Sequence, residues 1–239
     1  MRVAIGSSGF SYPTWKGRFY PADLPAERML AYYARRLDTV ELNNTFYRLP
    51  SRERLATWAG EVYRGFTFAL KAPQRITHVA RLSGAAEILS IFLGNASELG
   101  SLLGPILFQL PPSLRPDAPL LSDFLDLLPR GLRAAFEFRH RDWLLDDRVP
   151  DLLHQHAKAI CFAETDTAAT PWLATTTYGY LRLRRSSYST GDLTALAKAI
   201  QEQPWREAFA YFKHEESALA PTYASRLREL LVAEPLHPE

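Results

Sequence analysis

Seven polar residues stand at or near the C-terminal ends of short apolar runs that have the composition of β-strands. They are Glu41, Asn43, Lys71, Gln109, Glu137, Arg139 and Arg182. A carboxylate in a partly desolvated site can have its pKa raised toward neutrality, so we predict that Glu41 and Glu137 transfer protons. Lys71 completes the predicted catalytic set. We expect the remaining four residues, Asn43, Gln109, Arg139 and Arg182, to bind the ligand. Arginine suits this role because it forms bidentate hydrogen bonds with phosphate or carboxylate.

The chemistry open to these residues depends on how they are spaced. Two close carboxylates could act as acid and nucleophile, as in a glycosidase. With Arg139 or Lys71 between them, both carboxylates would stay ionised and would bind a ligand instead. Lys71 could form a Schiff base, but we favour a salt bridge from Lys71 to Glu41 or Glu137. The alternative for the whole set is an ion-pair network that only closes the barrel top.

Aromatic side chains after the strands extend the predicted binding set. Six aromatic residues could stack on a sugar or a base: Tyr12, Trp15, Phe46, Tyr47, Trp143 and Tyr188. We include Tyr12, Trp15 and Tyr47 in the binding set, together with His78, which also follows a strand. The competing interpretation is that these rings pack loops together. The long segment 8–25 is rich in aromatic residues, proline and glycine, so we expect an ordered flap over one end of the barrel.

The histidines do not form a recognisable metal motif. His78, His140 and His214 stand near strand ends, but no His-x-His or His-Glu-x-x-His pattern occurs. We therefore expect neither a tightly bound transition metal nor a cofactor. Glu164 and Asp166 remain possible ligands for a hard metal ion.

Apolar runs alternate with amphipathic stretches along the whole chain, which indicates repeated βα units. Eight strands are predicted, near residues 3–7, 39–43, 66–71, 106–110, 134–139, 159–164, 178–184 and 208–213. Helices are predicted near 26–37, 51–61, 84–102, 117–128, 148–157, 192–202 and 217–232. Segment 165–177 shows no helical pattern, so we expect a loop between the sixth and seventh strands. The eight predicted strands, alternating with helices, predict a TIM (β/α)₈ barrel that forms one domain over residues 1–239.

Alternation along each strand decides which side chains face inward. On the second strand, Glu41 shares its face with Thr39, while Val40 and Leu42 face the helices. The same test directs Glu137 and Arg139 inward on the fifth strand. It also places Lys71, Gln109 and, on the seventh strand, Tyr180, Arg182 and Arg184 on inner faces. Charges that arrive from several strands then meet at the barrel mouth.

Composition excludes several classes of protein. The 239 residues are 47% hydrophobic and 23% charged, as in a globular domain, and the net charge of +2 gives no strong general attraction to polyanions. Cys161 is alone, lies in an apolar run, and is interpreted as a packing residue. We find neither the roughly 7–15-residue apolar core of a signal peptide nor the roughly 18 apolar residues of a membrane span. We therefore expect a cytoplasmic protein that has no contact with membranes.

Several short motifs resemble those of the YecE-like family of barrel proteins, domain of unknown function 72. They include Gly6-Ser-Ser-Gly-Phe-Ser-Tyr12, Thr39-Val-Glu-Leu-Asn-Asn-Thr-Phe-Tyr47, Phe68-Ala-Leu-Lys71, Leu107-Phe-Gln-Leu-Pro-Pro112 and Glu137-Phe-Arg-His140. The resemblance implies a (β/α)₈ barrel and brings no settled activity. Its comparison with endonuclease IV and sugar isomerases is an analogy of fold. The sequence departs from the family at Phe212-Lys-His-Glu215, where an asparagine-containing ending is commoner; the role of Lys213 and His214 is thus open.

Three functional hypotheses follow from this pattern. The first is an enzyme acting on a small polar metabolite that is anionic or sugar-like, bound at the barrel mouth. The second is a nucleic-acid-binding protein, such as a nuclease or repair factor, which the near-neutral charge disfavours. The third is a non-enzymatic interaction scaffold. The sequence does not indicate an oligomeric state.

Overall fold

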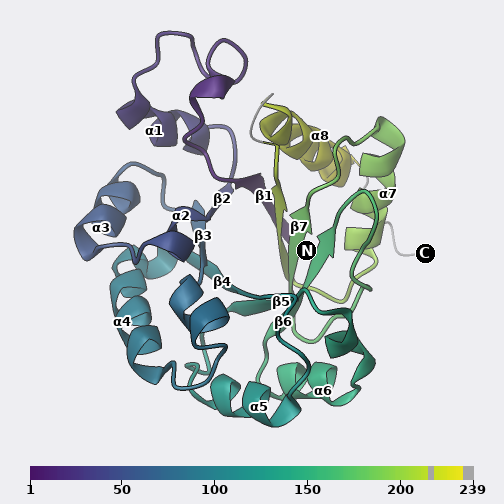
Figure 1. Ribbon diagram of the computed structural model, residues 1–239. Helices are drawn as coiled ribbons and strands as arrows, with labels where there is room; N and C mark the ends of the chain where they lie inside the picture. The colour runs from purple at the N-terminus through teal and green to yellow at the C-terminus, as the bar shows by residue number, and fades with distance from the viewer. Residues whose placement is uncertain (215–217, 234–239) are drawn as a thin grey trace.

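Eight parallel strands form a closed barrel in the computed structural model, which describes residues 1–214 and 218–233 (Figure 1). Each strand pairs with the next one in sequence, and β8 pairs with β1 to close the ring. The strands are β1 (Arg2–Ser8), β2 (Thr39–Leu42), β3 (Thr67–Lys71), β4 (Leu103–Leu110), β5 (Ala134–Phe138), β6 (Ala159–Glu164), β7 (Tyr178–Leu183) and β8 (Glu207–Phe212). The predicted TIM barrel and its eight strands are confirmed.

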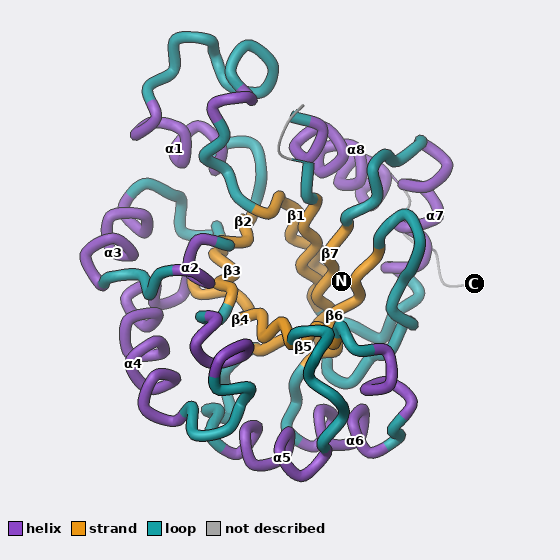
Figure 2. Tube along the Cα trace, in the orientation of Figure 1, coloured by secondary structure: helices purple, strands orange, loops and turns teal. Residues whose placement is uncertain are grey.

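Helices surround the ring of strands (Figure 2). The α-helices are α1 (Met29–Ala34), α2 (Asn44–Tyr47), α3 (Arg52–Gly60), α4 (Ala86–Ala96), α5 (Ala118–Asp126), α6 (Arg148–Gln155), α7 (Thr190–Gln201) and α8 (Leu219–Ala233). Shorter 3₁₀ turns lie at Pro13–Trp15, Ala26–Arg28, Ser97–Leu102 and Arg141–Leu145, and a π-helical turn lies at Arg75–Val79. None of the helices in the described ranges combines the length and apolarity needed to span a bilayer.

Alternating side chains build two separate apolar layers. Leu181 and Leu183 of β7 belong to the layer between strands and helices, while Tyr180 belongs to the layer inside the barrel. Cys161 also lies in the inner layer and is buried, as predicted for a packing residue. Burial raises the pKa of the Cys161 thiol, so the thiol is protonated. The inner layer fills the barrel up to the level of the polar residues at its C-terminal end.

The helices differ from the prediction in two boundaries and in two additional short elements. The helix expected over 84–102 is divided, because Gly100 adopts a left-handed φ of 50° inside the 3₁₀ turn that follows α4. The helix expected over 26–37 consists of a 3₁₀ turn and then α1, which ends at Ala34. The short α2 and the π-helical turn after β3 were not predicted. Segment 165–177 contains no helix, as predicted. Glu215 and the start of the last predicted helix, at 217, lie outside the described residues.

The aromatic segment 8–25 is packed by its own rings. Trp15 is fully buried and lies against Phe19, with centroids 5.7 Å apart, and against Tyr20, with centroids 6.1 Å apart. The segment lies outside the ring of strands and beside α1 (Figure 2). The expectation that it covers one end of the barrel is therefore wrong. Its aromatic rings bury one another and leave the barrel mouth uncovered by this segment.

Candidate functional site

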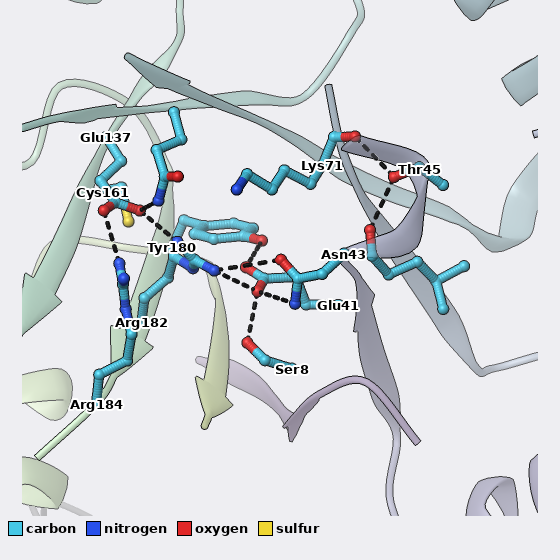
Figure 3. Close-up of polar contacts among 12 residues, drawn as sticks. Ser8, Glu41, Asn43, Thr45, Lys71, Glu137, Cys161, Tyr180, Arg182 and Arg184 are labelled. Atoms are coloured by element: carbon cyan, nitrogen blue, oxygen red, sulfur yellow. Dashed lines mark hydrogen bonds and ion pairs between the residues drawn. The ribbon is translucent and has the colours of Figure 1, made fainter. Parts of the chain in front are cut away.

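A single guanidinium joins the two predicted catalytic carboxylates. Arg182, at the end of β7, donates from Nη2 to Glu41 Oε1 over 2.9 Å and from Nη1 to Glu137 Oε2 over 2.6 Å. All three side chains are buried. Figure 3 shows Arg182 between the two carboxylates, which come from β2 and β5. A cation between the carboxylates was one of the two predicted arrangements, but the cation is Arg182 and not the expected Arg139 or Lys71.

Glu41 is held by hydrogen bonds from three further side chains. Ser8 Oγ donates to Oε1 over 2.5 Å, Tyr180 donates its hydroxyl to Oε2 over 2.6 Å, and Asn43 Nδ2 donates to Oε1 over 3.1 Å. Strand register makes the first contact possible, because Ser8 of β1 lies directly opposite Glu41 of β2. Burial by itself raises the pKa of Glu41, but Arg182 and the donors Ser8 and Tyr180 together lower it below its ordinary value.

Glu137 accepts hydrogen bonds from three arginines and one amide. Arg182 and Arg184 each donate over 2.6 Å, Arg139 Nε donates over 3.2 Å, and Gln109 Nε2 donates over 2.8 Å. Gln109 reaches it because the two residues are paired between β4 and β5. Burial raises the pKa of Glu137, but the three arginines outweigh burial and lower it far below its ordinary value.

Both carboxylates are therefore ionised, with their oxygens occupied by donors. The expectation that their pKa values rise toward neutrality is wrong, because Arg182 lies between them. A glycosidase-like pair would need a protonated carboxyl as its acid, and neither residue supplies one. Glu41 and Glu137 instead hold Arg182 in place.

Lys71 ends β3, the strand that pairs with β2 and so lies beside Glu41 in the barrel. Its Nζ lies 3.8 Å from the centroid of the Phe46 ring and makes no hydrogen bond or ion pair with any residue that the structure describes. The side chain extends toward the cluster (Figure 3). The favoured salt bridge to Glu41 or Glu137 is therefore wrong, because these carboxylates already pair with arginines.

The pKa of Lys71 is lowered to about 8. Burial is the largest cause, and the positive charge of Arg182 adds to it, while Glu41 and Glu137 act in the opposite direction. The carboxylates do not restore the pKa because their charge is neutralised locally by the arginines. A lysine with such a pKa is partly neutral near physiological pH.

Two rim residues surround Phe46 at the mouth. The ring of His78 meets Phe46 edge-on at 4.9 Å, and the exposed ring of Tyr47 meets it edge-on at 5.0 Å. Burial, together with the charges of Lys71 and Arg139, lowers the pKa of His78, so His78 is neutral at pH 7. Both residues belong to the predicted binding set, and both have surface available to a ligand.

The mouth carries a surplus of positive charge. Its cationic side chains number four and its carboxylates two; the cations are Lys71, Arg139, Arg182 and Arg184. The side chain of Arg139 is 41% exposed although Nε contacts Glu137, so part of its guanidinium faces solvent. An anion approaching the mouth thus meets both exposed and buried cations.

The remaining two predicted binding residues, Tyr12 and Trp15, lie in segment 8–25. Tyr12 donates its hydroxyl to the Ser8 carbonyl over 2.6 Å and lines an open groove of about 1040 Å³ between this segment and α3. Asn43 also lines that groove and links it to the polar cluster. Trp15 has no exposed surface, so its predicted contact with a ligand is replaced by a packing role.

The residues considered for a metal do not converge. His140 Nδ1 accepts a hydrogen bond from the Asp142 backbone, and His214 Nε2 lies 3.2 Å from the Ser186 carbonyl. Asp166 accepts hydrogen bonds from Ser186. Within residues 1–214 and 218–233, no three His, Cys, Asp or Glu side chains are placed to hold a metal ion.

Four further residues complete the site: Ser8, Phe46, Tyr180 and Arg184. The sequence placed Tyr180 and Arg184 on the inner face of β7 and Phe46 among the rings that could stack on a ligand, but it did not indicate Ser8. Ser8 and Tyr180 bind Glu41, Arg184 binds Glu137, and Phe46 contacts Lys71. Strand parity carries a signal for Tyr180 and Arg184, which share the inward face with Arg182. Phe46 was considered as a stacking ring, but its contact with Lys71 was missed because it depends on the unpredicted α2.

Comparison with known sequences decides the family. A sequence model of the family described as protein of unknown function DUF72 matches residues 4–239. The chain belongs to the DUF72 family. The curated relative UPF0759 protein YecE of Escherichia coli strain K12 is 32% identical over 139 residues, which is 58% of this chain and 48% of the relative. The matched segment thus spans about half the length of that relative.

Solved DUF72 structures share the architecture. A DUF72 family protein from Thermotoga maritima MSB8 superposes with a TM-score of 0.81 at 24% identity, covering 97% of this chain and 100% of the other. A second, from Enterococcus faecalis V583, gives a TM-score of 0.80 at 19% identity, covering 99% and 98%. At these identities the likeness extends to the fold alone. The resemblance to the YecE-like DUF72 proteins is confirmed.

Proposed function

We propose that this DUF72 protein is an enzyme acting on a small polar metabolite, anionic or sugar-like, bound at the barrel mouth. The observation that carries the proposal is the half-buried amine of Lys71, which has no ion-pair partner among the described residues although two carboxylates lie in the same cluster. An unpaired, partly desolvated cation at the C-terminal end of a barrel strand is suited to ligand binding or reaction.

The proposal gives different tasks to the cations of the mouth. Arg182 is buried and Arg184 is partly buried, both against carboxylates, and they form the floor of the site. Arg139 is partly exposed, so it would contact the anionic group of the ligand, and the positive charge of the unpaired Lys71 nearby would add to the attraction. Because burial strengthens interactions between charges, the surplus positive charge favours an anion over a neutral or cationic compound.

The carboxylates act indirectly under this proposal. Glu41 and Glu137 orient Arg182 and do not exchange protons with the substrate, since both are ionised and fully engaged. Lys71 is then the group that reacts, and Asn43 and Gln109 border the ligand with their amides. Tyr47 and His78 supply ring surface at the rim for an apolar or sugar face of the ligand.

A thermal-shift screen with phosphorylated sugars, oxo acids and hydroxy acids tests the proposal. Binding stabilises the fold by RT ln(1 + [L]/Kd), about 2.7 kcal/mol at a hundredfold excess over Kd. We expect at least one anionic compound to raise the Tm of the wild type and to have little effect on Lys71→Met. The control variant Lys198→Met alters an exposed lysine in α7 and should respond as the wild type does. If no compound in the library shifts the wild-type Tm, the proposal is wrong.

A further inference from the structure

The chain contains five lysines, and their surroundings differ sharply. Lys158 donates to three backbone carbonyls over 2.8 to 3.3 Å, which fixes it as a structural residue. Lys198 is exposed and pairs with Glu202 over 3.9 Å. Lys16 and Lys213 are exposed as well. Lys71 combines partial burial with an amine that no described acceptor contacts.

We propose that Lys71 forms a Schiff base with the substrate, and that the substrate is therefore an aldehyde or ketone that also carries an anionic group. This inference rests on the proposed function, because it assumes that the ligand binds at the barrel mouth. It adds the chemical class of the reacting group. The anionic part would lie against Arg139, and the carbonyl carbon would lie at the amine.

Hydrogen bonds hold the backbone at Lys71 in place, and this defines the position from which the side chain extends. Thr45 Oγ1 donates to the Lys71 carbonyl over 2.7 Å and lies 2.8 Å from the Leu42 carbonyl. This contact joins the end of β3 to the start of α2 (Figure 3). The next residue in α2, Phe46, then supports the amine with its ring face. A reactive amine held in this manner approaches a bound carbonyl from one side.

The absence of an ion pair matters for reactivity. A carboxylate in contact with Lys71 would keep the amine protonated, and a protonated amine has no electron pair for attack on carbon. Here Arg182 pairs with Oε1 of Glu41 and with Oε2 of Glu137. Burial and the Arg182 charge lower the pKa of Lys71 to about 8, which leaves a fraction of the amine neutral at physiological pH.

A proton carrier lies beside the same aromatic ring. His78 contacts Phe46 at 4.9 Å, is neutral, and has Nδ1 2.9 Å from Thr77 Oγ1. In Schiff base formation the neutral Lys71 amine attacks the carbonyl carbon, and the carbonyl electron pair moves to oxygen, which takes up a proton. The carbinolamine then loses the nitrogen proton and the hydroxyl group as water. His78 can accept and return the protons, and the net change is the release of water without any oxidant or reductant.

Borohydride trapping tests the inference. The full-length protein is mixed with pyruvate or glycolaldehyde phosphate, treated with sodium borohydride, and analysed by intact mass and peptide mapping. Lactate and glycerol phosphate serve as probes of similar charge without the carbonyl. Hydride addition to the imine gives a stable secondary amine, so the mass rises by that of the carbonyl compound less an oxygen atom. We expect the adduct on Lys71 and its loss in Lys71→Arg, which keeps the positive charge, while Lys198→Arg is labelled as the wild type is.

The outcomes separate this inference from the proposed function. An adduct confined to Lys71 with a carbonyl probe supports the Schiff base. If the carbonyl and non-carbonyl probes raise the Tm equally and no adduct forms on Lys71, the mouth binds anions but the Schiff base is wrong. The Schiff base proposal is also contradicted if the exposed lysines are labelled to the same level as Lys71. Because mapping is done on the wild type, the test does not depend on the folding of a variant.

Discussion

The amine of Lys71 rests on the ring face of Phe46, with Nζ 3.8 Å from the ring centroid. A cation over an aromatic face gains roughly 0.5–2 kcal/mol, less than a buried ion pair loses when one partner is removed. The ring thus retains the amine at the mouth and favours its protonated form only modestly, less than a paired carboxylate would. The contact between Lys71 and Phe46 depends on α2, in which Thr45 donates a hydrogen bond to the Lys71 carbonyl. The proposed function therefore depends on Lys71 and Phe46.

The first prediction concerns Lys71 and stability. Replacing Lys71 by Met removes a desolvated cation, so we expect the free energy of unfolding at neutral pH to rise by about 1 kcal/mol, as is common when functional residues are replaced. Chemical denaturation of the wild type and of Lys71→Met measures this difference in the free energy of unfolding. Lys198→Met, at an exposed position, should change stability by less than about 0.5 kcal/mol. A loss of stability in Lys71→Met would show that the amine is a structural cation.

The second prediction is the pH dependence of that difference. The folded-state pKa of Lys71 is about 8 and its ordinary value is 10.5. Between these values the unfolded chain holds a proton that the folded chain has released, so the wild type gains stability as pH rises through this window. The stability gap between Lys71→Met and the wild type should therefore narrow from neutral pH toward pH 10.5. A gap that stays constant would contradict the lowered pKa.

The third prediction concerns Glu137. In Glu137→Gln the buried Arg182 loses one carboxylate and Arg184 loses its own, so we expect a loss of about 3–5 kcal/mol in the free energy of unfolding. The control is Glu202→Gln, which removes an exposed ion pair with Lys198 and should cost under about 0.5 kcal/mol. Similar losses in the two variants would mean that the buried cluster contributes little to stability.

Acid unfolding gives a fourth prediction. The folded-state pKa values of Glu41 and Glu137 lie below the ordinary 4.5. Their contribution to stability is fully present above pH 4.5 and is lost as pH falls through the lower folded values, because the unfolded chain binds protons first. Wild-type stability should therefore fall more steeply below pH 4.5 than that of Glu137→Gln. Parallel curves for the two proteins would contradict the ionised state of Glu137.

A fifth prediction separates ligand contact from packing among the aromatic residues. Tyr47 is 75% exposed at the rim, so Tyr47→Ala should weaken binding of any compound identified by the thermal-shift screen and change stability by less than about 0.5 kcal/mol. Trp15 is fully buried, and Trp15→Ala should cost about 3–5 kcal/mol. Denaturation and binding are measured on both variants. If Tyr47→Ala leaves binding unchanged, Tyr47 does not contact the ligand.

The inward direction of the strand side chains is the feature of the site that could be predicted from the sequence. Side chains alternate along every strand, so the inward direction of Glu41, Glu137 and Arg182 follows from the apolar residues on either side of each. The eight strands themselves are visible as apolar runs. Both inferences are local, which is why they are confirmed.

The partners of these side chains could not be predicted in the same way. Glu41 and Tyr180 are 139 residues apart in sequence, and their hydrogen bond depends on the closure of the barrel. The expected salt bridge of Lys71 is absent for a related reason. Arg182, which comes from a distant part of the sequence, pairs with both carboxylates. The position of segment 8–25 was mispredicted because its aromatic residues specify packing among themselves without specifying where on the barrel the segment lies.

The measurement that tests the central claim most directly is a calorimetric titration with sulfate, whose charge is constant from pH 7 to pH 10. Binding at the mouth uses the positive charge of Lys71, so the wild-type Kd should rise about tenfold as pH passes through 8, equivalent to about 1.4 kcal/mol. In Lys71→Arg the charge persists and the Kd should stay constant over the same range. Sulfate binding with the same pH dependence in both proteins, or no binding to the wild type, would contradict the proposal that Lys71 and the surplus charge of the mouth bind an anionic ligand.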